Sequence, residues 1–251
     1  THHEPGAFRS FVPIMHGCDN FCSYCIVPYV RGREISRNPI DILAELDELR
    51  DVGVREVTLL GQNVNSYKWK DGSLELDFPD LLQLIASHLK KGQKSEGIGW
   101  IRFLTSHPKD LSDKLIAVMA NEPVLCRHIH LCLQSGSDRV LASMNRKYTV
   151  EYFIKVVEAF RKEIPEITIS TDIIVGFPSE TEKQFNDSLE ILKKIKPDAI
   201  NLSRYAAREG TIAAKMKQLS TNTLKQRSRI MTNVYWQLAY EKNKNWLNWE
   251  G

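Results

Sequence analysis

The stretch Gly17-Cys18-Asp19-Asn20-Phe21-Cys22-Ser23-Tyr24-Cys25 places three cysteines in one short loop with the spacing Cys-x3-Cys-x2-Cys. Soft thiolate ligands select zinc, copper(I) or iron–sulfur clusters, so the spacing predicts a metal site. A closed zinc site needs a fourth ligand, which His16 could supply. A cubane cluster held by three cysteines instead leaves one iron open for a substrate or cofactor.

Length and composition indicate a globular protein with a real core. The chain has 251 residues, of which 42% are hydrophobic and 26% are charged, and its formal net charge is +3. A charge this small predicts only local basic patches for nucleic-acid contact. The sequence shows no membrane-spanning run, and the clustered cysteines favour a reducing compartment, so we expect a cytoplasmic protein.

Outward from the loop, apolar periodicity predicts alternating strands and helices, which favours a parallel sheet with helices outside. The expected strands are 8–15, 55–60, 100–104, 127–133, 167–175 and 198–202, and the expected helices are 39–50, 78–89, 111–120, 150–164, 181–195 and 221–245. Residues 68–77 are expected to be a polar excursion. The segment after each strand collects polar residues, as at the carboxyl-terminal face of barrel enzymes. We therefore predict an α/β fold, an open three-quarter TIM-like barrel of about six βα units; a doubly wound sheet is the alternative.

Several segments carry a family resemblance. The Cys-x3-Cys-x-aromatic-Cys pattern resembles the signature of radical S-adenosylmethionine (SAM) enzymes, and residues 17–34 resemble the tRNA methylthiotransferases of MiaB type. Residues 56–67, 100–108, 134–137, 144–149 and 171–181 fit the same family. The resemblance implies the radical SAM barrel over residues 1–220. Residues 221–251 would then be a helix leading to a missing C-terminal TRAM domain, and the N-terminal domain of the family would be absent as well.

The resemblance also implies cofactors and an activity. Cys18, Cys22 and Cys25 would hold a [4Fe–4S] cluster that reductively cleaves SAM, so the cofactor rather than a catalytic side chain carries the chemistry. A second [4Fe–4S] cluster would occur only in the full-length protein. The reaction would add a 2-methylthio group to N6-(dimethylallyl)adenosine beside the tRNA anticodon, using a low-potential electron donor, with a monomeric enzyme and no membrane partner.

Two other functions stay open. Residues 201–211 and 215–220 resemble the branch that acts on N6-threonylcarbamoyladenosine. A zinc-bearing RNA-binding module without redox chemistry is the non-enzymatic alternative.

Candidate contacts follow from the strand ends. Tyr24 is expected to stack on the adenine of SAM, and other SAM contacts are expected from Gln62, Asn63, Gln134, Ser135, Asp172, Gly176 and Arg204. Gly176 could equally be a turn glycine. The run Arg31, Arg33 and Arg37 is the candidate RNA phosphate site, because Arg matches phosphate bidentately.

The remaining polar and aromatic residues are expected to be structural. His16 and His107 are predicted to form hydrogen bonds rather than ligate metal. Cys126 and Cys132 are interpreted as packing residues. Trp236, Trp246 and Trp249 are interpreted as docking or core aromatics of the last helix.

Overall fold

The computed structural model describes residues 6–91, 97–244 and 247, and these form two compact units. The first unit comprises Thr1–Asp19, Val27–His130 and Ala159–Ile167, and the second comprises Asn20–Ile26, Leu131–Glu158 and Thr168–Gly251. The cysteine loop is therefore divided: Cys18 belongs to the first unit, whereas Cys22 and Cys25 belong to the second.

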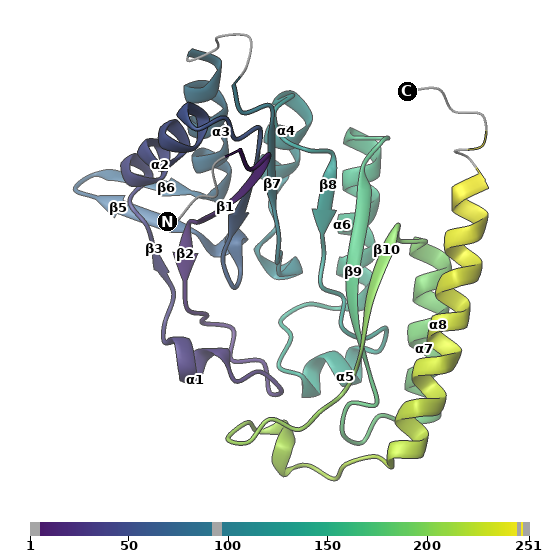
Figure 1. The fold of residues 1–251 in the computed structure, drawn as a ribbon. Helices are drawn as coiled ribbons and strands as arrows, with labels where there is room; N and C mark the ends of the chain where they lie inside the picture. The colour runs from purple at the N-terminus through teal and green to yellow at the C-terminus, as the bar shows by residue number, and fades with distance from the viewer. Residues whose placement is uncertain (1–5, 92–96, 245–246, 248–251) are drawn as a thin grey trace. The chain divides into compact units, whose positions relative to one another are not determined.

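The first unit holds most of the strands (Figure 1). Its elements in chain order are β1 (Arg9–Pro13), β2 (Met15–His16), α1 (Val27–Arg31), β3 (Ile35–Ser36), α2 (Pro39–Asp51), β4 (Glu56–Leu60), η1 (Val64–Ser66), β5 (Lys68–Asp71), β6 (Leu74–Asp77), α3 (Phe78–Lys91), β7 (Trp100–Phe103), η2 (Pro108–Asp110), α4 (Asp113–Asn121) and β8 (His128–His130).

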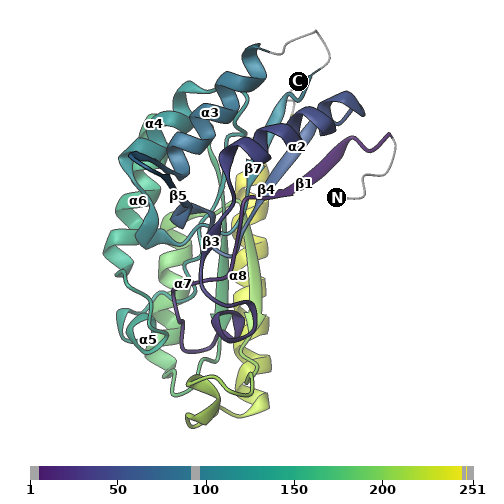
Figure 2. The ribbon, with the colours of Figure 1, turned by 90° about the vertical axis from the view of Figure 1, so that its left-hand side faces the viewer.

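A parallel sheet of order β1-β4-β7 forms the centre of this unit, with Arg9 opposite Glu56 and Glu56 opposite Trp100. Alternate side chains on the strands face the helices and are fully or almost fully buried: Val12, Val57, Leu59, Ile101 and Phe103. Helices α2 and α3 lie side by side against the sheet (Figure 2). The ring of Phe78 at the start of α3 meets that of Phe103 edge to face, at 5.0 Å between centroids.

The second unit contains α5 (Asp138–Ser143), β9 (Thr168–Val175), α7 (Glu182–Ile195), β10 (Ala199–Arg204), η3 (Ala213–Lys215) and α8 (Thr221–Asn243). Helix α6 (Val150–Glu163) crosses the division between the units. Strands β9 and β10 pair in parallel, and α8 packs against both β10 and α7 (Figure 1). Thr181 and Gln184 form a capping box that fixes where α7 begins.

Most predicted elements are confirmed within a few residues, and the differences have local causes. The predicted polar excursion is instead the antiparallel hairpin β5–β6, which turns at Gly72 with φ +57°. The sequence does carry a hairpin signal, because Leu74-Glu75-Leu76-Asp77 alternates apolar and polar residues after the two-residue loop Gly72-Ser73, but the strands are short and largely exposed. Strand β8 is shorter than predicted. The short helices α1 and α5 were not predicted, and the predicted end of the last helix at residue 245 lies outside the described residues.

None of the helices in the described ranges has the length and apolar character that a membrane crossing requires.

Candidate functional site

The first part of the cysteine loop is fixed by close backbone packing. Gly17 has φ +76°, and a Cβ built there would lie 1.9 Å from the Arg33 carbonyl oxygen, so only glycine fits this approach. The Cys18 amide donates to the Gly32 carbonyl at 3.1 Å. Asp19 adds an exposed ion pair to Arg33 at 2.8 Å. The segment around Arg33 thereby sets the backbone path through Cys18.

The second part of the loop is fixed by the segment that follows α5. The Asn145 side-chain amide donates to the carbonyls of Asn20 and Phe21, at 3.3 and 2.9 Å. Asn145 itself adopts φ +58°, a conformation that Asn tolerates better than most residues. The hydroxyl of Ser23 donates to the Ser143 carbonyl at 2.8 Å.

Within this part the Cys25 amide donates to the Cys22 carbonyl at 2.9 Å, which closes a tight turn between the two thiols. Cys22 is buried and Cys25 is partly exposed.

A buried arginine contacts this half of the loop, and the sequence analysis did not identify it as a site residue. Arg146 donates from Nη1 to Cys22 Sγ at 3.4 Å, from Nη2 to the Cys132 carbonyl at 3.0 Å and from Nε to the Tyr148 hydroxyl at 3.2 Å. Burial opposes its charge, but Tyr148, Tyr24, Cys22 and Cys132 outweigh this and raise the pKa of the Arg146 guanidinium. The only signal in the sequence was its place in the family-like segment 144–149.

Tyr24 packs into the core of the second unit. Its ring lies against a buried cluster made of Val140, Met144, Phe177, Tyr205 and Ala213. Burial raises the pKa of the Tyr24 phenol well above its usual range. The contacts account for its aromatic character through packing, and stacking on adenine stays a prediction.

The strand ends of the second unit bring several predicted residues together. Gln134 has φ +69°, and its backbone bonds the chain on both sides of Ile173, at Asp172 O and Ile174 N. Its side-chain oxygen is buried without a hydrogen-bond partner among the described residues. Asp172 accepts a hydrogen bond from Asn201 at 3.1 Å.

Ser135 and Gly176 have clear structural roles in the same unit. Ser135 is fully buried, with its hydroxyl 3.5 Å from that of Ser188 on α7. Gly176 has φ +75°, and a Cβ there would meet Leu224 of α8 at 2.6 Å. Its amide donates to Glu180 at 2.9 Å, as expected of a turn glycine. The predicted SAM contacts of both residues stay predictions.

The loop after β4, in the first unit, contains two predicted SAM contacts whose side chains differ in their hydrogen bonding. The Asn63 amide donates to Asp110 Oδ2 at 2.7 Å and its oxygen accepts from the His107 amide at 3.1 Å, so both polar atoms are engaged by neighbouring protein groups. The expected hydrogen-bonding role of His107 is confirmed, because its Nδ1 accepts from the Lys109 amide at 3.3 Å. Gln62, in contrast, keeps a buried side-chain oxygen without a partner in the described part of the chain.

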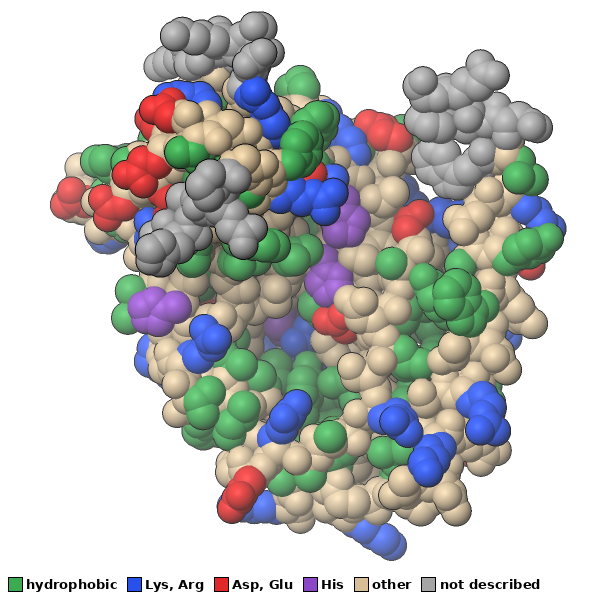
Figure 3. All heavy atoms as spheres, in the orientation of Figure 1, with side chains coloured by type: hydrophobic (Ala, Val, Ile, Leu, Met, Phe, Trp, Pro, Cys, Tyr) green, Lys and Arg blue, Asp and Glu red, His purple; other side chains and the backbone are tan. Residues whose placement is uncertain are grey.

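The arginines of the predicted basic run differ in their partners and exposure. Arg37 is held by Glu45 at 2.7 Å and donates to the Pro13 carbonyl, which gives it a structural role. Arg33 pairs with Asp19, whereas Arg31 and Arg204 are exposed at the ends of α1 and β10. On the face in Figure 3, Lys and Arg side chains occur singly or in small groups rather than in one continuous patch.

The other cysteines and the outer tryptophan also have defined surroundings. Cys132 is buried and Cys126 is partly buried, and burial raises the pKa of both thiols. His16 is exposed on β2. Trp236 is 63% exposed on α8, with its ring 5.3 Å from that of Tyr235, so it is not a core residue, and its docking role stays a prediction. Trp246 and Trp249 lie outside the described residues.

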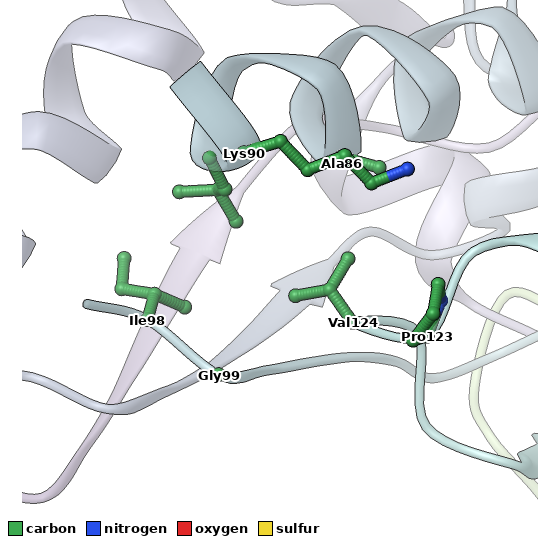
Figure 4. A pocket seen from close by; sticks show the side chains of 7 residues that line it. Ala86, Lys90, Ile98, Gly99, Pro123 and Val124 are labelled. Atoms are coloured by element: carbon green, nitrogen blue, oxygen red, sulfur yellow. The ribbon is translucent and has the colours of Figure 1, made fainter. Parts of the chain in front are cut away.

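A cavity of about 180 Å³ lies between the end of α3 and the start of β7 (Figure 4). Its lining is mostly apolar, and its one charged residue, Lys90, pairs with Glu122 at 2.6 Å. Gly99 places this cavity at the amino-terminal end of β7, whereas the polar residues of the candidate site follow the carboxyl ends of strands. The cavity therefore lacks the chemistry expected of an active site.

Comparison with known families identifies the group to which these motifs belong. The Radical SAM superfamily profile matches residues 12–192. The chain belongs to the Radical SAM superfamily. Proteins of this superfamily use a [4Fe–4S] cluster and SAM, which confirms the predicted cofactors.

Similar curated proteins are about 50% identical to this chain over most of its length. A tRNA-2-methylthio-N(6)-dimethylallyladenosine synthase from Treponema denticola is 52% identical over 212 residues, covering 84% of this chain and 46% of the relative. One of the same name from Caldicellulosiruptor saccharolyticus is 48% identical over 239 residues, covering 95% and 49%. The chain thus spans about half the length of the relatives it matches.

Solved structures of radical SAM enzymes have a similar fold. Coproporphyrinogen III oxidase (HemN) from Escherichia coli gives a TM-score of 0.69 at 16% identity, covering 94% of this chain and 54% of that one. The methyltransferase TsrM from Kitasatospora setae, solved with cobalamin and a [4Fe–4S] cluster bound, gives 0.68 at 16% identity, covering 81% and 38%. The predicted fold class, an α/β fold of the radical SAM type with parallel strands, is therefore confirmed.

The residues present fit these cofactors. All three loop cysteines carry thiols, which are the ligands that iron–sulfur clusters take in proteins. The buried side-chain oxygens of Gln62 and Gln134 have no partner among the described residues, and a buried polar atom normally has one. In each unit taken by itself, this oxygen is an acceptor for a hydrogen bond from a polar ligand such as SAM.

Proposed function

We propose that this chain is the SAM-cleaving core of a tRNA methylthiotransferase that modifies N6-(dimethylallyl)adenosine. The observation that carries the proposal is the name shared by relatives that are 48–52% identical over most of this chain. The second of these matches extends over 95% of the chain. The reaction would add a 2-methylthio group to the adenosine beside the anticodon.

In this proposal Cys18, Cys22 and Cys25 hold the [4Fe–4S] cluster, which supplies the electron for reductive cleavage of SAM. The residues proposed to bind SAM are Tyr24, Gln62, Asn63, Gln134, Ser135, Asp172, Gly176 and Arg204. Gln62 and Gln134 are supported best, because each presents a buried oxygen that lacks a described protein partner. Asn63 is supported least, because Asp110 and His107 already engage its amide.

The tRNA backbone is proposed to contact Arg31, Arg33 and Arg37. Arg31 is the best supported of the three, because Arg37 is occupied by Glu45 and Arg33 by an exposed pair with Asp19. We further infer a radical SAM unit over residues 1–220, with residues 221–251 leading into a separate C-terminal domain. We expect a second [4Fe–4S] cluster only in the full-length protein, which would act as a cytoplasmic monomer with a low-potential electron donor.

Anaerobic reconstitution tests the cofactor part of the proposal. We expect a brown protein with about four irons and four sulfides per chain, which converts SAM to 5′-deoxyadenosine when dithionite is added. Iron, sulfide and zinc analysis with chromatography of the nucleosides measures this. A colourless protein that carries zinc alone would overturn the proposal of a radical SAM enzyme and favour the zinc-bearing RNA-binding module.

The substrate requires a separate experiment in cells. We expect the full-length gene to restore the methylthio group on N6-(dimethylallyl)adenosine in a strain that lacks the corresponding enzyme. Mass spectrometry of digested tRNA measures both candidate nucleosides in the same sample. Methylthiolation of N6-threonylcarbamoyladenosine in its place would support the second branch, which residues 201–211 and 215–220 resemble.

A further inference from the structure

The guanidinium of Arg146 lies at the centre of a buried polar network in the second unit. The residue is only 8% exposed, and each of its three side-chain nitrogens has a partner on a different residue. Nη1 donates to Cys22 Sγ at 3.4 Å and Nη2 to the Cys132 carbonyl at 3.0 Å. The Tyr148 hydroxyl accepts from Nε and itself donates to the carbonyls of Cys132 and Leu133, at 2.8 and 2.7 Å.

The network fixes Arg146 in one orientation. The guanidinium also lies over the Tyr148 ring, with Cζ 5.2 Å from the centroid. Because the fork is rigid and planar, holding Nε and Nη2 also directs Nη1. The direction of Nη1 toward Cys22 is therefore a consequence of the fold around it.

The charge of Arg146 needs a counterpart in this buried place. A buried cation is costly unless it is paired with an anion and hydrogen-bonded. The Cys132 carbonyl and the Tyr148 hydroxyl are neutral acceptors, whereas Cys22 becomes a thiolate when it ligates a metal. A charge-assisted hydrogen bond from Arg146 to Cys22 would thus form fully once the metal site is filled.

We propose that Arg146 is a positioning residue that fixes the Cys22 sulfur and raises the reduction potential of a cluster bound there. The inference rests on the proposed function, because it requires Cys22 to be a cluster ligand. Hydrogen bonds to ligand sulfurs and nearby net charge are among the factors that set iron–sulfur potentials. A donor that withdraws electron density from the thiolate favours the reduced, more negative cluster.

The test compares the cluster potentials of matched variants of the full chain. Arg146→Lys keeps the charge without the fork, and Arg146→Met removes the charge while keeping a long side chain. Arg139→Gln is the control, because it removes one charge from an exposed position on α5 of the same unit. Each protein is reconstituted anaerobically, assayed for iron and sulfide, and titrated without SAM while the reduced cluster is followed by electron paramagnetic resonance.

We expect the midpoint potential to fall in the order wild type, Arg146→Lys, Arg146→Met, with Arg139→Gln equal to wild type. A potential in Arg146→Met equal to that of wild type would overturn the inference and leave the proposed function standing. If Arg146→Met binds no cluster, Arg146→Lys decides: a lowered potential supports the inference and an unchanged one overturns it. A wild-type protein without a cluster would overturn the proposed function and the inference together.

Discussion

The two halves of the cysteine loop are fixed by different kinds of interaction. Around Cys18 the chain is held by the backbone of nearby residues, through the Gly17 approach to Arg33 and the bond to Gly32. Around Cys22 it is held by side chains more than a hundred residues away, from Asn145 and Arg146. A short spacing motif can therefore depend on two separate structural frameworks.

Neither support was predicted from the sequence, but the two lie at very different distances along it. Gly17 and the residues around Arg33 belong to one family-like string, so the resemblance included them. Asn145 and Arg146 lie in segment 144–149, which resembles the same family, but nothing in their spacing indicates that the fold brings them to the Cys22 half of the loop.

Both halves of the cysteine loop are expected to supply ligands to the cluster. Changing Cys18→Ala in the first half or Cys22→Ala in the second should each abolish cluster binding, because a cubane with two remaining thiolates loses one of its few anchors. Iron and sulfide analysis after anaerobic reconstitution measures this. Cys126→Ala and Cys132→Ala serve as controls and should keep the wild-type iron content. If Cys18→Ala kept the wild-type iron content, the first half of the loop would supply no cluster ligand.

The second prediction concerns the backbone packing of the first half. Gly17→Ala should lower the free energy of unfolding by more than about 2 kcal/mol, because a non-glycine residue is strained there and its Cβ would meet backbone. Gly32→Ala is the matched control: its φ is +75°, yet a Cβ there has nothing within 4 Å, so about 1 kcal/mol of strain is expected. Urea denaturation of both variants gives the comparison. Equal losses would show that the close approach at Gly17 is not what fixes this half.

The third prediction concerns the side-chain support of the second half. Asn145→Gly accepts the positive φ but removes both donors to the loop carbonyls, so it should cost about 1–2 kcal/mol of unfolding free energy. The Asn121 amide donates to a helix carbonyl in an exposed place, so Asn121→Ala should change stability by less than about 0.5 kcal/mol. Chemical denaturation measures both. A loss as small as that of the control would indicate that Ser23 and Arg146 alone fix the second half.

Other parts of the candidate site show how far residue type predicts a role. Asn63 and Gln134 follow strand ends in the same way, and the sequence offers no reason to separate them. In the structure their hydrogen bonding differs. Asp110 and His107 bond the Asn63 side-chain amide, whereas the Gln134 side-chain oxygen lacks a partner among the described residues. The positions of strands and helices along the chain follow from local patterns, but the hydrogen bonds of a polar side chain depend on neighbours that only the tertiary structure supplies.

The smallest effect is expected at the surface of the first half, where Asp19 pairs with Arg33. The Arg33 side chain is 70% exposed and that of Asp19 is 38% exposed, so water and salt screen the attraction. Exposed ion pairs typically contribute less than about 1 kcal/mol, and Asp19→Asn, which keeps the side-chain shape, should cost no more than that. The remaining difference should vanish when urea denaturation is repeated in about 1 M salt, where the screening length is about 3 Å. A loss above about 2 kcal/mol that persists in salt would mean that the hydrogen bond from the Glu34 amide to Asp19 Oδ1, which is stronger to a carboxylate than to an Asn amide, holds the loop rather than the charge pair. The first half would then depend on side chains as the second does, and the contrast between the two would fail.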